Sequence, residues 1–176
     1  MLKAGCEIFA HYNTVMNKRL YTCAAQLDEA ALRLDRGAFF GSILGTLNHI
    51  LVADIIWLKR IAKHPARFNA LQPMTEFPTP AALNEILYPA LASLLYQRRA
   101  LDNIISTLVQ ELNDEVLASR LSYKNLRGEE INKTLGFVVL HFFNHQTHHR
   151  GQVTTLLTQL GLDVGATDLF LCIPDH

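Results

Sequence analysis

The chain has few cysteines, no excess of charge of either sign and no long apolar run, and each shortage excludes a class of protein. Its three cysteines, Cys6, Cys23 and Cys172, lie far apart and form no Cys-x-x-Cys pair, so neither a disulfide framework nor a thiolate metal site is indicated. The 16 basic residues equal the 16 acidic ones, whereas nucleic-acid-binding domains normally have a basic excess. We therefore expect free thiols in a reducing compartment and no nucleic acid among the partners.

Signals for export and for membrane insertion are also lacking. The N-terminal stretch MLKAGCEIFAHYN has no apolar core of a signal peptide, and apolar runs such as FVVL (137–140) are far too short to span a membrane. We therefore expect a cytoplasmic protein with no membrane partner. The 176 residues, 49% of them hydrophobic, suffice for a substantial core, and we assign residues 1–176 to a single domain.

Helical periodicity is the dominant pattern in the sequence. Apolar residues recur at steps of three and four over residues 8–27 and again over 39–62, which predicts two helices. The second stretch is apolar nearly all round, which is typical of a helix buried on more than one side, in a bundle core or at a dimer interface. A third helix is predicted from Thr79-Pro80 to about 112, with a kink or break at Pro89.

The remaining segments complete the predicted architecture. Residues 63–80 contain four prolines and predict a long connection, and residues 120–134 predict either a small hairpin or an extended loop. A fourth helix is predicted over 135–160, ending at Gly161, followed by an irregular tail. Four long helices and one long crossover predict an all-α fold, a four-helix bundle.

Half of the eight histidines lie within LHFFNHQTHHRGQV, residues 140–153. At about 100° per residue, His149 lies on the apolar face of the fourth helix and His145 at its margin, one turn away. Imidazoles on an apolar face need partners, and the i, i+4 spacing directs two rings at one point, as on the helix of zinc metalloproteases. Those enzymes have a glutamate after the first histidine, where this chain has Gln146, so their mechanism is not implied.

A metal site needs at least one more ligand, and the residues alone leave its identity open. His49 is the leading candidate because it lies on a face of small, uncharged residues in the second helix. His11, near the start of the chain, and His64, at a helix end, are the alternatives, and both are equally compatible with surface positions. Asp54, the acidic residue near His49, lies about 140° from it on the helix and is poorly placed as a general base.

Three segments carry a family resemblance: YNTVMNKRL, GSILGTLNHILVADIIWLKRI and HFFNHQTHHRGQVTTLLTQLG. They resemble the DinB/YfiT-like family of metalloenzymes, and the resemblance extends over nearly the whole chain. It implies a four-helix bundle with a long crossover, a homodimer, and a divalent metal ion bound by His49, His145 and His149. The family motif also includes His148, Arg150 and Gln152, which we assign to packing or hydrogen bonding, with Gln152 within reach of a ligand histidine.

The resemblance and the histidines together predict a divalent-metal-dependent enzyme that acts on a small molecule. Three imidazoles leave coordination positions open, as in catalytic sites, and suit zinc, nickel, iron or manganese. The leading hypothesis is a thiol-dependent S-transferase or isomerase that uses a low-molecular-weight thiol and a small electrophile. The alternatives are a metal-dependent hydrolase and a non-catalytic, metal-binding stress-response dimer. His141 is a marginal neighbour of the site and His148 has a structural role in this interpretation.

Overall fold

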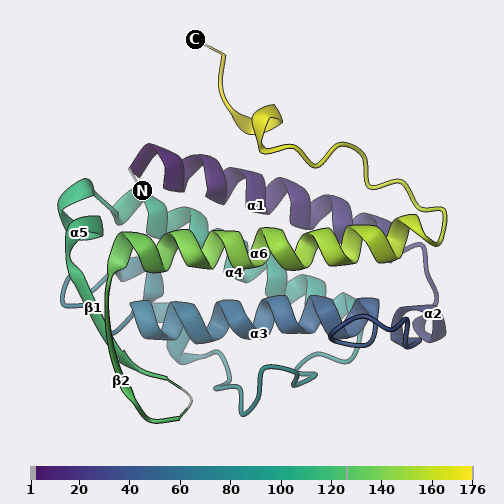
Figure 1. The fold of residues 1–176 in the computed structure, drawn as a ribbon, viewed down its shortest axis with the longest axis horizontal. Coiled ribbons are helices and arrows are strands. Elements are labelled where there is room, and N and C mark those ends of the chain that lie inside the picture. Colours follow the sequence, from purple (N-terminus) through teal and green to yellow (C-terminus); the bar gives the residue numbers. More distant parts are fainter. Residues whose placement is uncertain (1–2, 126, 176) are drawn as a thin grey trace.

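A computed structural model describes residues 3–125 and 127–175, and it contains four long helices that lie side by side (Figure 1). They are α1 (Lys3–Ala24), α3 (Ile43–Ile61), α4 (Leu91–Glu111) and α6 (Leu135–Thr158). The shorter elements lie in the connections and in the tail: α2 (Glu29–Arg33), η1 (Asn69–Thr75), α5 (Asp114–Ala118), β1 (Arg120–Lys124), β2 (Glu130–Thr134) and η2 (Leu169–Cys172). The predicted all-α four-helix bundle is confirmed.

The helices follow an up-down-down-up order, because the connection between α3 and α4 runs back along the whole bundle (Figure 1). Contacts agree with this order. Lys3, at the start of α1, bonds to the carbonyl of Gln110 at the end of α4, so these two helices are antiparallel. Asn48, early in α3, bonds to the backbone of Tyr88 just before α4, so α3 and α4 begin at the same end. The long crossover predicted from the prolines is therefore the connection of residues 62–90.

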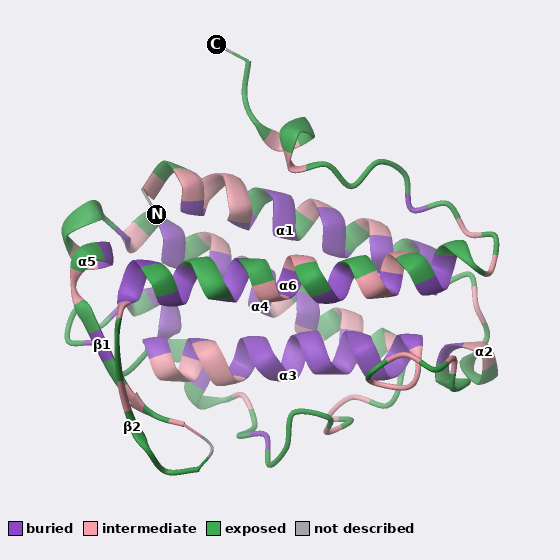
Figure 2. Ribbon diagram, in the orientation of Figure 1, coloured by how far each residue is buried: buried purple, intermediate pink, exposed green. Residues whose placement is uncertain are grey.

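Helix α3 forms the centre of the core, and every residue from 43 to 55 is buried (Figure 2). Ser42 caps its N-terminus, with its hydroxyl accepting from the backbone N–H of Gly45 at 3.0 Å. Leu47, Leu51 and Leu58 are almost fully buried, and each contributes about 1.5–3 kcal/mol through burial. The predicted burial on more than one side is confirmed. The rest of the same chain covers α3, so its apolar surface requires no dimer interface.

The predicted start of the third helix is wrong, because α4 begins at Leu91 and residues 79–90 form an irregular loop. Two side chains of α3 bind the loop backbone at Leu83 and Tyr88, which holds it against the bundle. Tyr88 also precedes Pro89, and a residue before proline is disfavoured in the helical region. Pro89 therefore lies just before the helix and does not kink it.

The other boundaries agree more closely with the sequence. Strands β1 and β2 pair antiparallel from Arg120 opposite Thr134 to Lys124 opposite Glu130, so the hairpin is the correct one of the two alternatives for this segment. Helix α6 ends just before Gly161, which has a φ of +77° that favours glycine. Within the described residues, no helix combines the length and apolar character needed to cross a membrane.

Candidate metal centre

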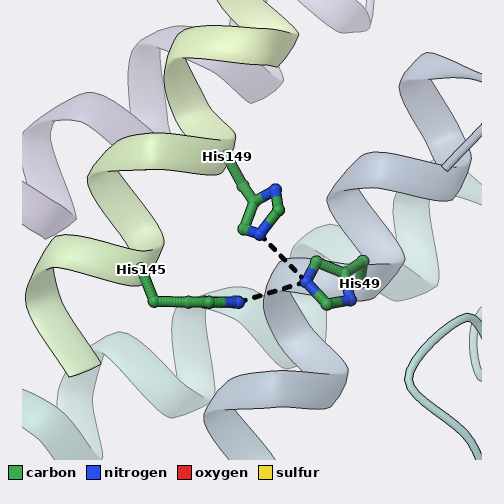
Figure 3. Close-up of side chains that lie close together, drawn as sticks. All are labelled: His49, His145 and His149. Atoms are coloured by element: carbon green, nitrogen blue, oxygen red, sulfur yellow. Dashed lines mark hydrogen bonds between the residues drawn. The ribbon is translucent and has the colours of Figure 1, made fainter. Parts of the chain in front are cut away.

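The structure brings His49, His145 and His149 together at the interface of α3 and α6 (Figure 3). The Nε2 atom of His49 lies 3.2 Å from Nε2 of His145 and 3.2 Å from Nε2 of His149. His145 and His149 occupy successive turns of α6, and His49 faces both from the antiparallel α3. One ring nitrogen from each of the three residues lies within 4.8 Å of the other two. We refer to these residues as the histidine cluster.

Two rings of the histidine cluster are oriented by hydrogen bonds from their outer nitrogens. Nδ1–H of His49 donates to the carbonyl of Leu83 in the crossover, at 2.8 Å. Nδ1–H of His149 donates to Oε1 of Gln152 at 2.9 Å, and the Gln152 amide nitrogen lies 3.3 Å from Nε2 of His148. These bonds place the proton of each ring on Nδ1, which leaves Nε2 as a free lone pair directed into the cluster.

Burial keeps the cluster uncharged. It lowers the pKa of His49 to about 4 and that of His145 to about 3, and it lowers the pKa of His149 as well. At neutral pH all three rings are therefore neutral, the form in which imidazole binds a metal ion. His49 and His149 are buried and His145 is partly exposed, so the cluster is accessible through the His145 side.

The arrangement fits a divalent cation. With the protons on Nδ1, the Nε2 atoms of His49 and His149 are both acceptors, and at 3.2 Å their lone pairs face each other without a donor between them. A shared cation satisfies both lone pairs. Zinc–nitrogen bonds of about 2.0–2.1 Å at a tetrahedral angle place two ligand nitrogens roughly 3.3 Å apart, close to the observed separations.

Phe40 covers one side of the cluster, a role that the sequence did not reveal. Its ring stacks on His49 at 3.6 Å between centroids and meets His149 edge-on at 5.5 Å. The helical periodicity had placed Phe40 inside the second helix, but α3 begins only at Ile43. Gly45 permits this packing, because a Cβ at position 45 would overlap the carbonyl oxygen of Phe40.

The other four histidines of the described residues lie outside the cluster. His11 is exposed on α1, and His64 is buried elsewhere, with Nε2 2.9 Å from the Ser119 hydroxyl. His141 lies one turn before His145, with 6.0 Å between ring centroids, and stacks edge-on against Trp57. His148 is exposed; its ring meets that of His149 edge-on at 4.8 Å between centroids, and its Nε2 lies near the Gln152 amide. Of the three candidates for the third position, the structure places His49 beside the α6 pair.

A buried polar network lies next to the cluster and joins all four long helices. Arg98 on α4 contacts Asp54 on α3 at 2.5 Å and Asp102 at 3.0 Å. Asp102 accepts from two asparagines of α1, and Asp54 accepts from Gln146 at 2.8 Å, the residue that follows His145. Burial opposes the charge of Arg98, but the two carboxylates more than offset this and hold its pKa above the usual range.

This network was not predicted from the sequence, although the polar residues that form it follow a regular spacing. Each contributing helix except α3 carries two polar residues four positions apart on its buried side: Asn13 and Asn17, Arg98 and Asp102, Gln146 and Arg150. The network also decides the position of Asp54, which is tied to Arg98 and Gln146. No Asp or Glu of the described residues joins the histidine cluster.

Comparisons with known proteins agree with this fold. The model of the DinB family matches residues 1–173. Protein DinB of Bacillus subtilis is 24% identical over 162 residues, which cover 89% of this chain and 87% of that protein. The crystal structure of a DinB-like protein from Bacillus cereus superposes with a TM-score of 0.61 at 19% identity, over 90% of this chain and 94% of that chain.

Proposed function

The chain belongs to the DinB family, and on this premise we propose that His49, His145 and His149 bind a divalent metal ion that makes the protein a metal-dependent enzyme. The observation that carries the proposal is the convergence of three neutral imidazoles on one point, with two Nδ1 atoms tied to acceptors and the Nε2 lone pairs directed inward. Three protein ligands are the number found in catalytic zinc sites, whereas structural sites have four.

A divalent cation in this position would supply Lewis-acid chemistry, since it favours the deprotonated form of a thiol or water and polarises a carbonyl group. The residues of the chain would hold the cation and shield it from water. His49 and His149 are held in place by Leu83 and Gln152, and Phe40 excludes water from one side of the cluster. The partly exposed side, at His145, is where a substrate would approach.

The reaction that we propose is the transfer or isomerisation of a small electrophile with the help of a low-molecular-weight thiol. Hydrolysis is the weaker alternative, because no carboxylate of the described residues joins the histidine cluster to act as a general base for water. The nearest acidic candidate from the sequence, Asp54, is buried and bound to Arg98. A thiol has a much lower pKa than water, so a nearby cation would hold more of it as thiolate at neutral pH, with its proton released to solvent.

Metal content tests the site directly. Elemental analysis of the untagged protein should find about one divalent ion per chain, and the metal detected identifies the cofactor. Alanine substitutions at His49, His145 and His149 should each deplete it, whereas His11→Ala, which alters an exposed histidine on α1, should retain it. Retention of the metal in all three cluster variants would refute the proposed site.

The reaction class is tested with metal-loaded protein on two panels, one of thiols with electrophiles and one of esters and amides. Turnover that depends on the thiol supports the transferase or isomerase, and turnover on the second panel alone supports the hydrolase. Bound metal with no turnover on either panel supports the remaining alternative, a non-catalytic metal-binding protein.

A homodimer is part of the same proposal. Large apolar side chains that remain exposed in the single chain include Phe137 on α6, 67% exposed, and Phe170 in the tail, 77% exposed. Such side chains favour contact with a second copy of the chain. Sedimentation should show a dimer at micromolar concentration, and a monomer would contradict it.

A further inference from the structure

A pocket of about 370 Å³ opens beside the histidine cluster and extends along α3 toward the hairpin. His49 and His145 line it together with four residues that carry cations or aromatic rings: Trp57, Arg60, Arg127 and His141. None of the residues that line it is acidic. The pocket is therefore a basic, partly aromatic extension of the candidate metal centre.

Arg60 is held in this pocket by aromatic rings and not by a carboxylate. Its guanidinium carbon lies 4.7 Å from the ring centroid of Trp57 and 4.8 Å from that of Tyr123 on β1. The two rings, 5.5 Å apart and inclined at 75°, meet edge to face. Contacts of this kind orient a guanidinium while leaving its N–H groups available in the plane of the group.

No anion of the described residues compensates the charge of Arg60. Among the described residues, no carboxylate oxygen lies within 4.0 Å of Arg60 or Arg127, and none accepts a hydrogen bond from the Arg60 side chain. Burial lowers the pKa of Arg60, with Tyr123 opposing the effect, but the group stays charged. Elsewhere in the chain the arginines Arg33, Arg98 and Arg120 all donate to acceptors.

We propose that Arg60 is the anion-binding residue of the substrate pocket, and that Arg127 at the hairpin turn closes over the same group. The ligand is a small molecule with a carboxylate or phosphate at one end and its reacting group at the other, at the histidine cluster. A guanidinium in a fixed orientation binds either anion through two parallel hydrogen bonds. The inference rests on the proposed function for the role of the histidines, but anion binding by Arg60 does not require the metal ion.

The spacing along α3 sets the size of the ligand. Arg60 follows His49 by eleven positions, which corresponds to about 16 Å along a helix, and the long arginine side chain leans back toward the N-terminus. A ligand that contacts both is on the order of 10 Å long. A thiol the size of a tripeptide, or a phosphorylated thiol of similar length, fits this description, whereas a single amino acid is too short. The Trp57 ring lies between the two ends and suits an apolar stem.

Trp57 is the single tryptophan of the sequence, so its fluorescence reports on this pocket alone. Two matched pairs of probes are titrated: glutathione against its diethyl ester, and 4′-phosphopantetheine against pantetheine. We expect at least one anionic probe to bind about tenfold more tightly than its masked partner, as for a hydrogen-bonded ion pair. The pair that shows the preference identifies the anion as carboxylate or phosphate. Equal affinities within both pairs would overturn the proposal.

Substitutions assign the preference to Arg60. Arg60→Gln should reduce the affinity ratio of the preferred pair to about one, and Arg60→Lys should restore part of it, which a purely structural role would not predict. Arg99→Gln removes the same charge from an exposed position on α4, outside the pocket, and should leave the ratio unchanged. A ratio that survives in Arg60→Gln would refute the assignment.

Repeating the titrations after removal of metal by a chelator separates this inference from the proposed function. A charge preference that persists in chelated protein, or in protein that binds no metal at all, supports the anion site independently of the metal site. Normal metal content in Arg60→Gln, together with loss of the preference, supports both. Normal metal content in the wild type with no preference in any titration refutes the anion site alone.

Discussion

The buried network around Arg98 allows a quantitative prediction for the variant Arg98→Met. The guanidinium is 1% exposed and contacts Asp54 and Asp102, which are themselves buried. Methionine replaces its stem but leaves the two buried carboxylates without their ion-pair partner. Breaking a buried ion pair in this way costs about 3–5 kcal/mol of unfolding free energy. For a chain of this length, that corresponds to a fall in Tm of roughly 10 °C.

The pH dependence provides a sharper test of the same prediction. Burial raises the pKa of both Asp54 and Asp102, and Arg98 is the strongest of the groups that lower it. Without Arg98 the pKa of each carboxyl in the folded protein rises further above its unfolded value of about 3.9. Stability contributed by a raised pKa is present at low pH and lost as the pH rises. The deficit of Arg98→Met should therefore be larger at pH 8 than at pH 5.

The assay is urea unfolding of chelated protein at both pH values, since bound metal would add its own stabilisation. Arg99→Met, which makes the same change at an exposed position of α4, is the control and should cost less than about 0.5 kcal/mol. The triple variant Arg98→Met, Asp54→Asn, Asp102→Asn should be more stable than Arg98→Met alone, because the two carboxylates that lose Arg98 are no longer buried as charges. A loss below about 1 kcal/mol in Arg98→Met, or a deficit that grows toward pH 5, would refute this account.

Three further predictions concern the surroundings of the histidine cluster. Gly45→Ala should destabilise the fold by about 1–3 kcal/mol in thermal unfolding, because the new methyl group displaces the Phe40 carbonyl. Gly151→Ala, which adds a methyl group where there is open space, should be neutral or stabilising. Gln152→Ala should weaken zinc binding about 10- to 100-fold, measured by calorimetry, because it removes the acceptor that orients His149. An unchanged zinc affinity would contradict that role. Burial lowers the pKa of His49 to about 4, below the value of 6.5 in the unfolded chain. Metal-free protein should therefore lose stability as the pH falls from 6.5 toward 4. His49→Gln should weaken this pH dependence of the unfolding free energy, measured by urea titration.

The histidine cluster shows where sequence reasoning succeeds and where it stops. The i, i+4 spacing places His145 and His149 on one side of a single helix, and helix geometry alone fixes that relation. No such rule relates His49 to them, because 96 positions separate His49 from His145. Only the antiparallel packing of α3 on α6 brings the rings together. Their role as metal ligands stays a prediction until the metal content is measured.

The second half of the crossover, residues 79–90, and the polar network were not predicted from the sequence, for the same physical reason. The stretch around Thr79-Pro80 has a good helix start, but side chains of α3 bind the backbone that follows it, at Leu83 and Tyr88, and hold this segment as an irregular loop. The polar pairs on α1, α4 and α6 were visible in the sequence, but a polar residue on an apolar face can equally lie at the surface. Whether such residues meet depends on the rotation and order of the helices.

The sequence by itself determined the all-α class, the approximate helices, the hairpin segment and the pair of histidines on α6, because these follow from periodicity and spacing within one segment. The tertiary structure decided the rest: the third histidine, the Phe40 cover, the charged network and the basic pocket at Arg60. Each of these joins residues from different helices or loops, and the physical cause lies in contacts between segments. Such contacts depend on how the four helices pack, which no single stretch of the chain specifies.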